Sequence, residues 1–419
     1  MQKAWYKEMV VYQVWPRSFK DSNGDGIGDL EGIYSKLDYI KSIGIDAIWF
    51  SPLFCSPNAD YGYDIADYMD INPEYGDMDT FKKVLARAHE LEMKVFMDLV
   101  VNHTSTEHKW FKESCKSVDN PYHDYYIWRK GKGKNGKKPP NNWLSTFEGG
   151  AWEYVESVDE YYLHVFTKGQ PDLNMDNPKV REEVKNIMKF WLDMGVDGFR
   201  EDVITFISKP EGLPDDHIMP ASKGILMFNH GPHLYEYLDE FKRDVFSKYD
   251  CMTLAEAPMV SPKKALEYIT EDSSQVLDMM IQFKTQEADC FFTDFRHMPF
   301  SLRKMKRAFS MWQNGLEGKG WNMLYIENHD HPRMVSRYGS EKYPAESAKM
   351  LCAMYMFLKG TPFVYQGQEI GMSNWYPDDP AMYEDVQTRW QYENVGTKQS
   401  AKKRLERLWH GSRDSARTP

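Results

Sequence analysis

Short runs of apolar residues alternate with longer segments of helical periodicity along most of the chain. Each short run ends in polar residues, a pattern typical of repeated strand–helix units. Eight strands are predicted in this way, which is the number that forms a (β/α)8 (TIM) barrel. They span residues 10–16, 45–52, 94–103, 196–202, 252–258, 276–283, 323–330 and 362–370.

The segments between these runs have one apolar face at helical spacing. One stripe consists of Leu30, Ile33, Leu37 and Ile40, and a second runs through residues 81–91. Asn177 followed by Pro178 is a typical helix start, because Asn caps the first turn and Pro needs no backbone partner there. The α/β rhythm therefore extends across the chain.

One connection is too long for a loop between a strand and a helix, which usually has about 2 to 6 residues. Residues 104–174 are rich in Lys, Gly, Asn, Tyr and Trp. We interpret them as a subdomain inserted after strand three. The predicted division is a catalytic barrel made of residues 1–103 and 175–419, with the inserted subdomain at 104–174.

Charge and hydropathy restrict the partners and the location. The 419 residues are 42% hydrophobic and carry 52 Lys and Arg against 63 Asp and Glu, a net charge of -11. This balance disfavours nucleic acid or an anionic membrane and favours a neutral small substrate. No apolar run approaches the ~18 residues of a membrane span, and the first residues do not resemble a secretory signal. We expect a cytoplasmic protein; its oligomeric state stays open.

The five cysteines are odd in number and scattered, without a CxxC pair. Neither a disulfide framework nor a structural zinc site is indicated. We expect buried thiols.

Polar side chains gather where the predicted strands end. These are Asp98 with Asn102 and His103, Arg200 with Asp202, Glu256, and His329 with Asp330. In such barrels the active site lies at the carboxyl ends of the strands. A scaffold ion pair explains Asp98 with Arg200, but not the whole set, because crowded carboxylates cost free energy unless chemistry needs them. We therefore predict an active site at this mouth.

Several specific motifs resemble the α-amylase superfamily, glycoside hydrolase family 13. They are DLVVNH at 98–103, GFRED at 198–202, AEAP at 255–258 and ENHD at 327–330. The tracts QPDLN at 170–174, SNGDGIGDL near the start and YQGQEIGM at 365–372 are similar to the oligo-1,6-glucosidase branch. The resemblance extends from about Met9 to the last residue. It implies a retaining, exo-acting α-glucosidase on a barrel, with α-1,6 bonds of short isomalto-oligosaccharides as its target.

By this resemblance Asp202 is the nucleophile, Glu256 the general acid and then base, and Asp330 the transition-state stabiliser. Retention needs one ionised carboxylate and one protonated acid about 5 to 5.5 Å apart, which agrees with that assignment. Arg200 lies two residues before Asp202, so both side chains point into the mouth and the guanidinium keeps Asp202 ionised. For Glu256 we expect a pKa raised by burial and by neighbouring carboxylates.

The resemblance also implies the residues that bind the terminal glucose. His103 and His329 are expected to hydrogen-bond sugar hydroxyls, although a satisfied core histidine is the plainer reading of each alone. In ADYGYD, Asp60 and Tyr63 are expected to hold the sugar by a carboxylate and an aromatic floor. Arg413 resembles the arginine that pairs with this carboxylate and closes the pocket, which favours exo action.

A glycine-rich loop near the amino terminus alternates oxygen-bearing residues. It offers Asp21, Asn23, Asp25, the carbonyl of Ile27, and Asp29. Hard oxygen ligands at alternate positions suit Ca2+, or Mg2+ at a compact site. The loop lacks the glutamate of an EF-hand at the twelfth position, and a polar turn is the alternative. We predict a structural divalent cation and no organic cofactor.

Four features depart from the family pattern. Glu201 replaces a usually apolar residue and is expected to point away from the substrate. Met175 stands where a tryptophan often follows QPDLN, and Glu327 where an asparagine is common. The chain stops at Pro419, inside the family's RTPMQW tract, and is therefore expected to lack the carboxyl-terminal β-sandwich of the relatives.

Other activities fit the same residues. A sucrose isomerase or transglucosylase would share the site and differ in the acceptor, and an α-glucosidase that prefers α-1,4 bonds is a further alternative. A non-catalytic relative and a carbohydrate-binding protein without turnover fit the intact acidic set less well. Val203, after the predicted nucleophile, is the residue typical of the α-1,6 branch. The plain alternative is that Val203 packs against the helix layer.

Overall fold

The computed structural model describes residues 4–219, 222–291 and 294–417. Eight strands form a parallel sheet in the order β11-β10-β9-β5-β2-β1-β13-β12, a nearly closed barrel. They are β1 Val11–Val14, β2 Ala47–Phe50, β5 Lys94–Val100, β9 Gly198–Asp202, β10 Met252–Glu256, β11 Met279–Ile281, β12 Met323–Leu324 and β13 Thr361–Tyr365. The predicted fold class is confirmed.

All eight barrel strands lie where they were predicted, but each is shorter than predicted. The last one ends at Tyr365, because Gly367 takes a φ of 83° and starts a 3-10 turn at Gln368–Ile370. Strand β12 keeps only Met323–Leu324 of the predicted residues 323–330. The residues that follow Leu324 are as buried as strand residues, so their apolar pattern did not distinguish a strand from a buried loop.

The predicted helices are present, with one division. Asn177 accepts from the backbone N–H of Lys179 and starts α6 Pro178–Met194, and α4 Met78–Glu90 carries the second stripe. The first stripe is shared by α2 Leu30–Tyr34 and α3 Leu37–Ser42. The other helices are α1 Pro16–Phe19, α5 Lys109–Ser114, α7 Ile225–Phe228, α8 Leu234–Asp244, α9 Pro262–Ile269, α10 Leu302–Leu316, α11 Met334–Tyr338, α12 Pro344–Met356, α13 Val386–Asn394, α14 Ala401–Trp409 and α15 Asp414–Arg417.

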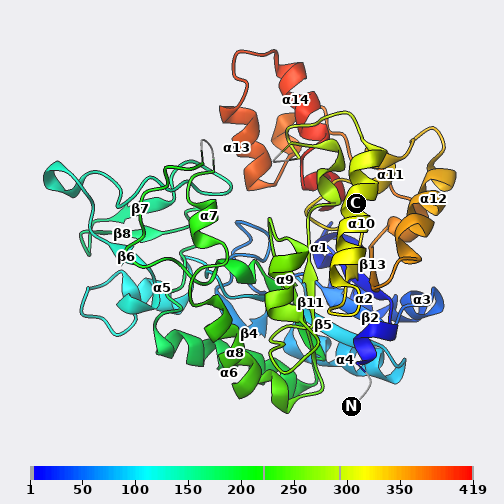
Figure 1. The fold of residues 1–419 in the computed structure, drawn as a ribbon, viewed down its shortest axis with the longest axis horizontal. Helices are drawn as coiled ribbons and strands as arrows, with labels where there is room; N and C mark the ends of the chain where they lie inside the picture. Colours follow the sequence, from blue (N-terminus) through cyan, green and yellow to red (C-terminus); the bar gives the residue numbers. More distant parts are fainter. Residues whose placement is uncertain (1–3, 220–221, 292–293, 418–419) are drawn as a thin grey trace. The chain divides into compact units, whose positions relative to one another are not determined.

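The chain divides into two compact units. The first contains the described residues within 1–51, 74–97 and 259–419. In it β1 pairs with β2 and with β13, so that Val11 lies between Ala47 and Phe363. Helices α10, α11 and α12 share an apolar cluster that includes Met305 and Leu351 (Figure 1).

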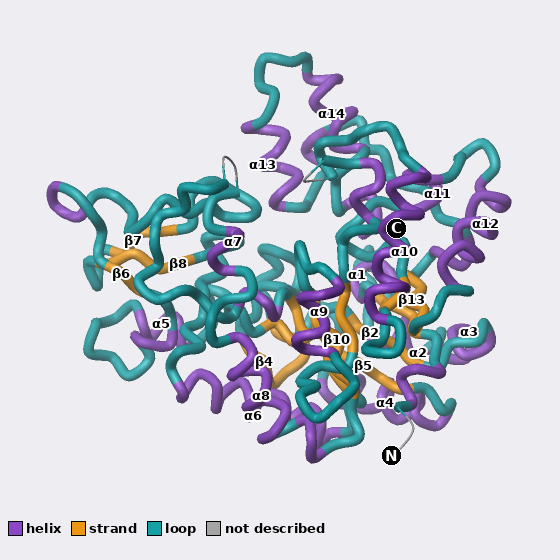
Figure 2. The backbone as a smooth tube through the Cα atoms, in the orientation of Figure 1, coloured by secondary structure: helices purple, strands orange, loops and turns teal. Residues whose placement is uncertain are grey.

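The second unit contains the described residues within 52–73 and 98–258. Its strands β9 and β10 pair in parallel, and a small ribbon joins β3 Phe54–Cys55 to β4 Asp67–Ile71. The predicted insertion carries a separate antiparallel sheet of order β6-β8-β7, visible in Figure 2, from Trp128–Arg129, Glu160–Leu163 and Trp152–Val155. The predicted boundaries at 104 and 174 stay a prediction.

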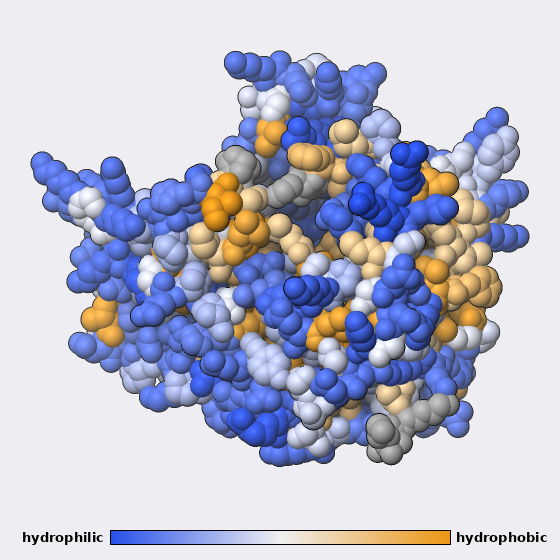
Figure 3. Space-filling model, viewed as in Figure 1, coloured by the Kyte–Doolittle hydropathy of each residue, from blue (hydrophilic) through white to orange (hydrophobic). Residues whose placement is uncertain are grey.

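The polarity of the surface, the helices and the cysteines can be compared with what the sequence predicted. The face drawn in Figure 3 is mostly hydrophilic, with scattered apolar residues. Within the described ranges, no helix is long and apolar enough to cross a membrane. None of the five cysteines forms a disulfide, and only Cys290 is buried. The prediction of buried thiols is therefore wrong for the other four, which are partly exposed.

Gly198 at the start of β9 tests the packing of β9 on β10. Its φ is 155°, and a Cβ built there would lie 2.1 Å from the carbonyl oxygen of Met252. Gly198→Ala should lower the free energy of unfolding by about 3 kcal/mol, because the two paired backbones must separate. Urea unfolding measures this.

Gly150→Ala is the matched control, since a Cβ there meets nothing within 4 Å. Equal stability of the Gly198→Ala protein and the wild type would contradict the close approach of the two strands.

Candidate active site

Arg200 lies at the centre of the acidic residues of the second unit. Alternation along β9 puts its side chain on the same face as that of Asp202, and Arg200 is only 1% exposed. Its Nη1 lies 2.8 Å from Asp98 Oδ1 and 2.6 Å from Asp202 Oδ1, and its Nη2 lies 2.8 Å from Glu256 Oε2. One guanidinium thus contacts three carboxylates. The structure brings the predicted nucleophile and the predicted acid/base together on it.

Asp98 is fully buried at the end of β5 and has two donors. Tyr63 Oη donates to its Oδ2 at 2.9 Å, and Arg200 donates to its Oδ1. Burial raises the pKa of Asp98 to about 7, although both donors oppose the rise. Burial also disfavours the charged form of Arg200, but the carboxylates of Asp98 and Glu256 hold its pKa well above the usual range. We therefore regard Arg200 as the permanent charge of the cluster.

Val203 connects the nucleophile segment to Glu256 through its backbone. Its φ of 35° lies in the left-handed region, which a β-branched residue rarely adopts. In this conformation its N–H donates to Glu256 Oε2 at 3.0 Å. Backbone strain of this kind persists only where the surrounding structure fixes it, and it gathers at functional sites. Glu256 Oε2 thus has two donors, this N–H and Arg200 Nη2. The expected raised pKa of Glu256 stays a prediction.

The side chain of Val203 belongs to an apolar cluster. This cluster contains residues of the predicted insertion, among them Trp143 and Phe166, and also Phe206 and Phe228, the last residue of α7. Residue 203 therefore directly follows Asp202, the predicted nucleophile, and shares an apolar cluster with the predicted insertion. Packing of Val203 against the helix layer stays an alternative interpretation.

The residues predicted to bind glucose in this unit form one buried group. Gln170 Nε2 donates to Asp60 Oδ2 at 3.1 Å and to the carbonyl of Tyr63 at 3.2 Å. His103 Nε2 lies 2.9 Å from the same carbonyl. Burial lowers the pKa of His103, which favours the neutral ring. The structure joins Asp60, Tyr63 and His103 as predicted, and adds Gln170 of the QPDLN tract, whose role the sequence did not assign.

His329 and Asp330 lie next to each other in the first unit. His329 Nδ1 lies 2.7 Å from Gln13 Nε2, and the ring stacks on Trp15 at a centroid distance of 5.4 Å. Its Nε2 lies 3.2 Å from Asp330 Oδ2. Gln13 and Trp15, at the end of β1, orient the imidazole toward the carboxylate.

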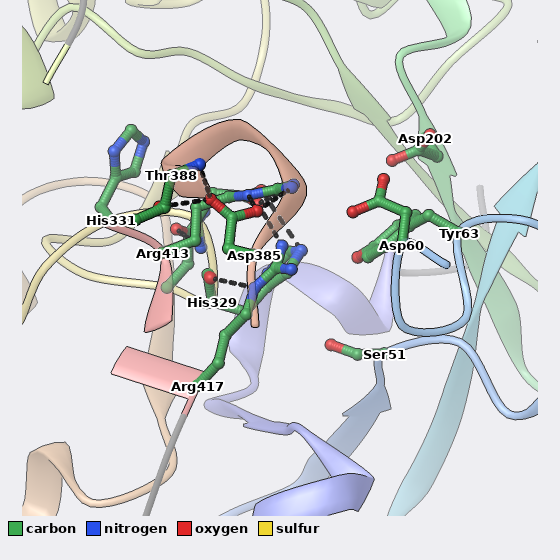
Figure 4. A network of polar contacts seen from close by, with 12 residues as sticks. Ser51, Asp60, Tyr63, Asp202, His329, His331, Asp385, Thr388, Arg413 and Arg417 are labelled. Atoms are coloured by element: carbon green, nitrogen blue, oxygen red, sulfur yellow. Dashed lines mark hydrogen bonds and ion pairs between the residues drawn. The ribbon is translucent and has the colours of Figure 1, made fainter. Parts of the chain in front are cut away.

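Two arginines near the carboxyl end of the chain accompany Asp330. Arg417 donates to the carbonyl of His329 at 2.8 Å (Figure 4). It also donates to Asp330 Oδ1 at 2.9 Å, whereas Arg413 Nη1 lies 3.7 Å from Asp330. Arg413 is held instead by Asp385, whose Oδ1 accepts from its Nε at 2.8 Å. The predicted pairing of Arg413 with Asp60 stays a prediction.

Asp385 is the buried counter-ion that the sequence reading missed. Burial raises its pKa, but Arg413 and Arg417 hold the pKa below the usual value. Its Oδ2 accepts from the backbone N–H of Thr388 and caps α13. Burial and the nearby charge of Asp385 raise the pKa of Asp414 to about 6. Neither Arg417 nor Asp385 lies at a predicted strand end, so nothing in the strand pattern indicated them.

The loop predicted to bind a cation is exposed and folded around its own carboxylates. Asp21 accepts from the N–H groups of Asn23, Gly24 and Gly26, and Asp25 from that of Ile27. Asp29 caps α2 and accepts from Ser22. Among the described residues, no group of three or more His, Cys, Asp or Glu is arranged to hold a metal ion. The oxygen donors have the hardness that Ca2+ needs, and cation binding stays a proposal.

Three of the residues that depart from the family pattern, Glu327, Met175 and Glu201, are buried in the structure. Glu327 is buried, contacts Arg333 Nη1 at 3.1 Å and accepts from the N–H of Met334 at the start of α11. Burial raises its pKa, and Arg333 opposes the rise. Met175 is buried, and Glu201 is fully buried on β9. Thr418 and Pro419, the end of the RTP tract, lie outside the described residues.

The chain is similar to known glycosidases over its whole length. Residues 13–419 match the family described as "Alpha amylase, catalytic domain". The chain is 52% identical over 430 residues to the oligo-1,6-glucosidase of Parageobacillus thermoglucosidasius and 50% identical over 425 residues to that of Bacillus cereus. Each match covers 100% of this chain and 75% of the relative.

Solved structures of two related enzymes have the same fold as this chain. The isomaltulose synthase of Klebsiella sp. LX3 superposes with a TM-score of 0.95 at 39% identity, covering 100% of this chain and 76% of that one. The trehalose-6-phosphate hydrolase of Bacillus licheniformis superposes with a TM-score of 0.92 at 45% identity, covering 99% of this chain and 74% of that one.

Arg200→Lys tests the central cation. A single ammonium keeps the charge but cannot place two separate nitrogens on Asp202 and Glu256, so kcat should fall by about a hundredfold or more. The free energy of unfolding should fall by about 3 kcal/mol, since three buried carboxylates lose part of their pairing. Steady-state kinetics and urea unfolding measure the two effects.

Arg181→Lys, which changes the pair between Arg181 on α6 and Glu240 on α8, is the control and should retain activity. Unchanged kcat in the Arg200→Lys protein would show that the fork geometry is dispensable.

Proposed function

Because the chain belongs to the α-amylase family of glycoside hydrolases, we propose that it is a retaining, exo-acting α-glucosidase of the oligo-1,6-glucosidase type. Its substrates are short α-glucosides, above all isomalto-oligosaccharides with α-1,6 bonds. Relatives named oligo-1,6-glucosidase at 52% and 50% identity support this choice. Isomaltulose synthases superpose well but at lower identity, 39%.

The observation that carries the proposal is the sharing of Arg200 by Asp202 and Glu256. Asp202 contacts Nη1 of the guanidinium, and Glu256 contacts Nη2 of the same group. This arrangement holds them close together, which suits the separation of about 5 to 5.5 Å of retaining enzymes better than the ~6.5 to 9.5 Å that leaves room for a water in inverting enzymes.

Each acidic residue has a role in the proposed double displacement. Asp202, kept ionised by Arg200, attacks the anomeric carbon and forms a glucosyl–enzyme ester, while Glu256 protonates the leaving oxygen. Glu256 then takes a proton from water, which releases glucose and restores Asp202. Asp330, oriented by His329 and Arg417, stabilises the positive charge that develops on the sugar. The reaction needs no organic cofactor.

The groups around Asp60 supply the proposed glucose subsite. We propose that Asp60 accepts hydrogen bonds from sugar hydroxyls and that Tyr63 provides an apolar surface for the ring. His103 and His329 are proposed to hydrogen-bond further hydroxyls. Arg413 is proposed to close the pocket by pairing with Asp60. A closed pocket admits a chain end and favours exo action.

The location and the cation belong to the same proposal. Five cysteines without a disulfide suit a reducing compartment, and we propose the cytoplasm. A Ca2+ or Mg2+ ion at Asp21, Asn23, Asp25, Ile27 and Asp29 would cross-link the exposed loop through hard oxygen donors. Such an ion would stabilise the fold and take no part in the chemistry.

Asp202→Asn tests the proposed reaction. The variant keeps the size of the side chain but loses the nucleophile, so isomaltose and nitrophenyl α-glucoside hydrolysis should fall by several orders of magnitude with the fold retained. Glucose release and circular dichroism measure this. Substantial residual kcat would require another nucleophile, and products of sucrose would distinguish an isomerase from a hydrolase.

Val203→Ala and Val203→Thr test the linkage preference. The side chain of Val203 is β-branched and stiff, and it shares an apolar cluster with residues of the predicted insertion. A smaller or more polar side chain next to Asp202 should leave more room for the leaving group of the substrate. We expect kcat/KM for maltose to rise tens of fold relative to isomaltose, corresponding to ~1 to 3 kcal/mol. A wild type that favours maltose, or an unchanged ratio, would contradict this role of Val203.

Chelation tests the proposed cation. Removal of the ion should lower the melting temperature, and activity should persist below the new melting temperature. Added Ca2+ or Mg2+ should restore the loss. An unchanged melting temperature after chelation and after metal addition would indicate that the loop is a polar turn.

A further inference from the structure

We propose that Lys209, a buried lysine to which no role has yet been given, is a positioning residue for the proposed glucose subsite. It acts through Asn102, which fixes His103 as the tautomer that carries its proton on Nε2. This inference rests on the proposed function for its kinetic consequence, but the protonation state of His103 is measurable without turnover.

Lys209 is enclosed in the second unit and contacts two side chains. Its Nζ lies 2.6 Å from Asp172 Oδ2 and 2.8 Å from Asn102 Oδ1. Burial lowers the pKa of Lys209, and the carboxylate of Asp172 opposes this shift. Because a buried charge is costly without a partner, the ion pair with Asp172 keeps the ammonium in place.

The contact with Lys209 decides which way the Asn102 amide faces. An ammonium only donates, so the atom that Lys209 contacts must be the amide oxygen. The other atom, Nδ2, is then an NH2 group, and it lies 3.2 Å from His103 Nδ1. His103 Nδ1 must therefore accept, and the single proton of the neutral ring sits on Nε2.

The contacts of the other ring nitrogen, Nε2, would by themselves allow either tautomer of His103. His103 Nε2 lies 2.9 Å from the carbonyl of Tyr63, which can only accept, and 3.2 Å from Gln170 Nε2. Gln170 Oε1 accepts from the N–H of Thr167, so its Nε2 is a donor. The carbonyl requires a protonated His103 Nε2, whereas a hydrogen bond from Gln170 requires a bare one. Local geometry alone allows both tautomers, and the Lys209–Asn102 contact selects the first.

The selected tautomer organises the turn that holds Asp60 and Tyr63. With His103 donating to the Tyr63 carbonyl, both N–H groups of Gln170 are available for Asp60 Oδ2 and for the same carbonyl. The turn needs such support, because Tyr61 and Gly62 have φ values of 46° and 100°. Asp60 and Tyr63 lie side by side on it (Figure 4). Lys209 thus acts on substrate binding and does not touch the substrate.

The direct test is long-range proton–nitrogen NMR on protein labelled with 15N-histidine. The His103 signals are assigned by their loss in His103→Asn. We expect the neutral Nε2–H pattern in the wild type and an Nδ1–H or mixed pattern in Lys209→Met, because the Asn102 amide is then released. The Nδ1–H pattern in the wild type, or an unchanged pattern in folded Lys209→Met, would overturn the proposal.

Asn102→Asp keeps the test decisive if Lys209→Met does not fold. The carboxylate retains the pairing with Lys209 but presents an acceptor to His103 Nδ1, so His103 should bear a proton there. Retention of a bare Nδ1 would contradict the proposal. Lys185→Met is the control, since this second buried lysine pairs with Glu240 and Asp244 on α8 and should leave the His103 signals unchanged.

Kinetics separate this role from general stabilisation. Lys209→Met should raise KM for isomaltose about tenfold, the effect of weakening one buried, charge-assisted network, with a much smaller change in kcat. A tenfold loss in kcat with unchanged KM would contradict this role, because Lys209 would then affect the chemical step and not substrate binding. If no glucosidase activity exists in the wild type, the proposed function fails while the NMR result still decides the tautomer.

Discussion

The acidic centre of this protein depends on the burial of one guanidinium among three carboxylates. Without Arg200, the side chains of Asp98, Asp202 and Glu256 would repel one another in a site that excludes water. With it, each carboxylate has a defined position, because the planar fork offers separate donors in fixed directions. The same geometry places a guanidinium nitrogen on Asp202, the proposed nucleophile. The packing of the acidic residues and the proposed chemistry therefore depend on the same side chain.

Residues of the predicted insertion contact the candidate site at two places. Trp143 and Phe166 share an apolar cluster with Val203, whose left-handed backbone directs an N–H to Glu256. Near residue 174, Gln170 contacts Asp60, and Asp172 pairs with Lys209. A change in the packing of these residues would therefore affect both the predicted nucleophile segment and the turn that carries Asp60 and Tyr63.

Much of the fold was predictable, because apolar periodicity reports burial directly. All eight barrel strands follow from it, and the capping residues Asn177 and Pro178 indicate the start of α6. Asp98, Arg200, Asp202 and Glu256 were found because they lie at or near the ends of predicted strands. The sequence pattern failed where the partners lie outside the predicted strand ends. Asp385, Arg417 and Lys209 are such residues, and only the folded chain brings them to their partners.

The most direct test of the account is the configuration of the glucose that is first released from nitrophenyl α-glucoside, observed by proton NMR before mutarotation, because all glucose from this substrate comes from the cleaved glycosyl unit. Attack by Asp202 followed by attack of water inverts the anomeric carbon twice, so the account predicts α-glucose as the initial product. Initial β-glucose would mean a single displacement by water. It would contradict the assignment of Asp202 and Glu256 as a nucleophile and acid/base pair held together by Arg200.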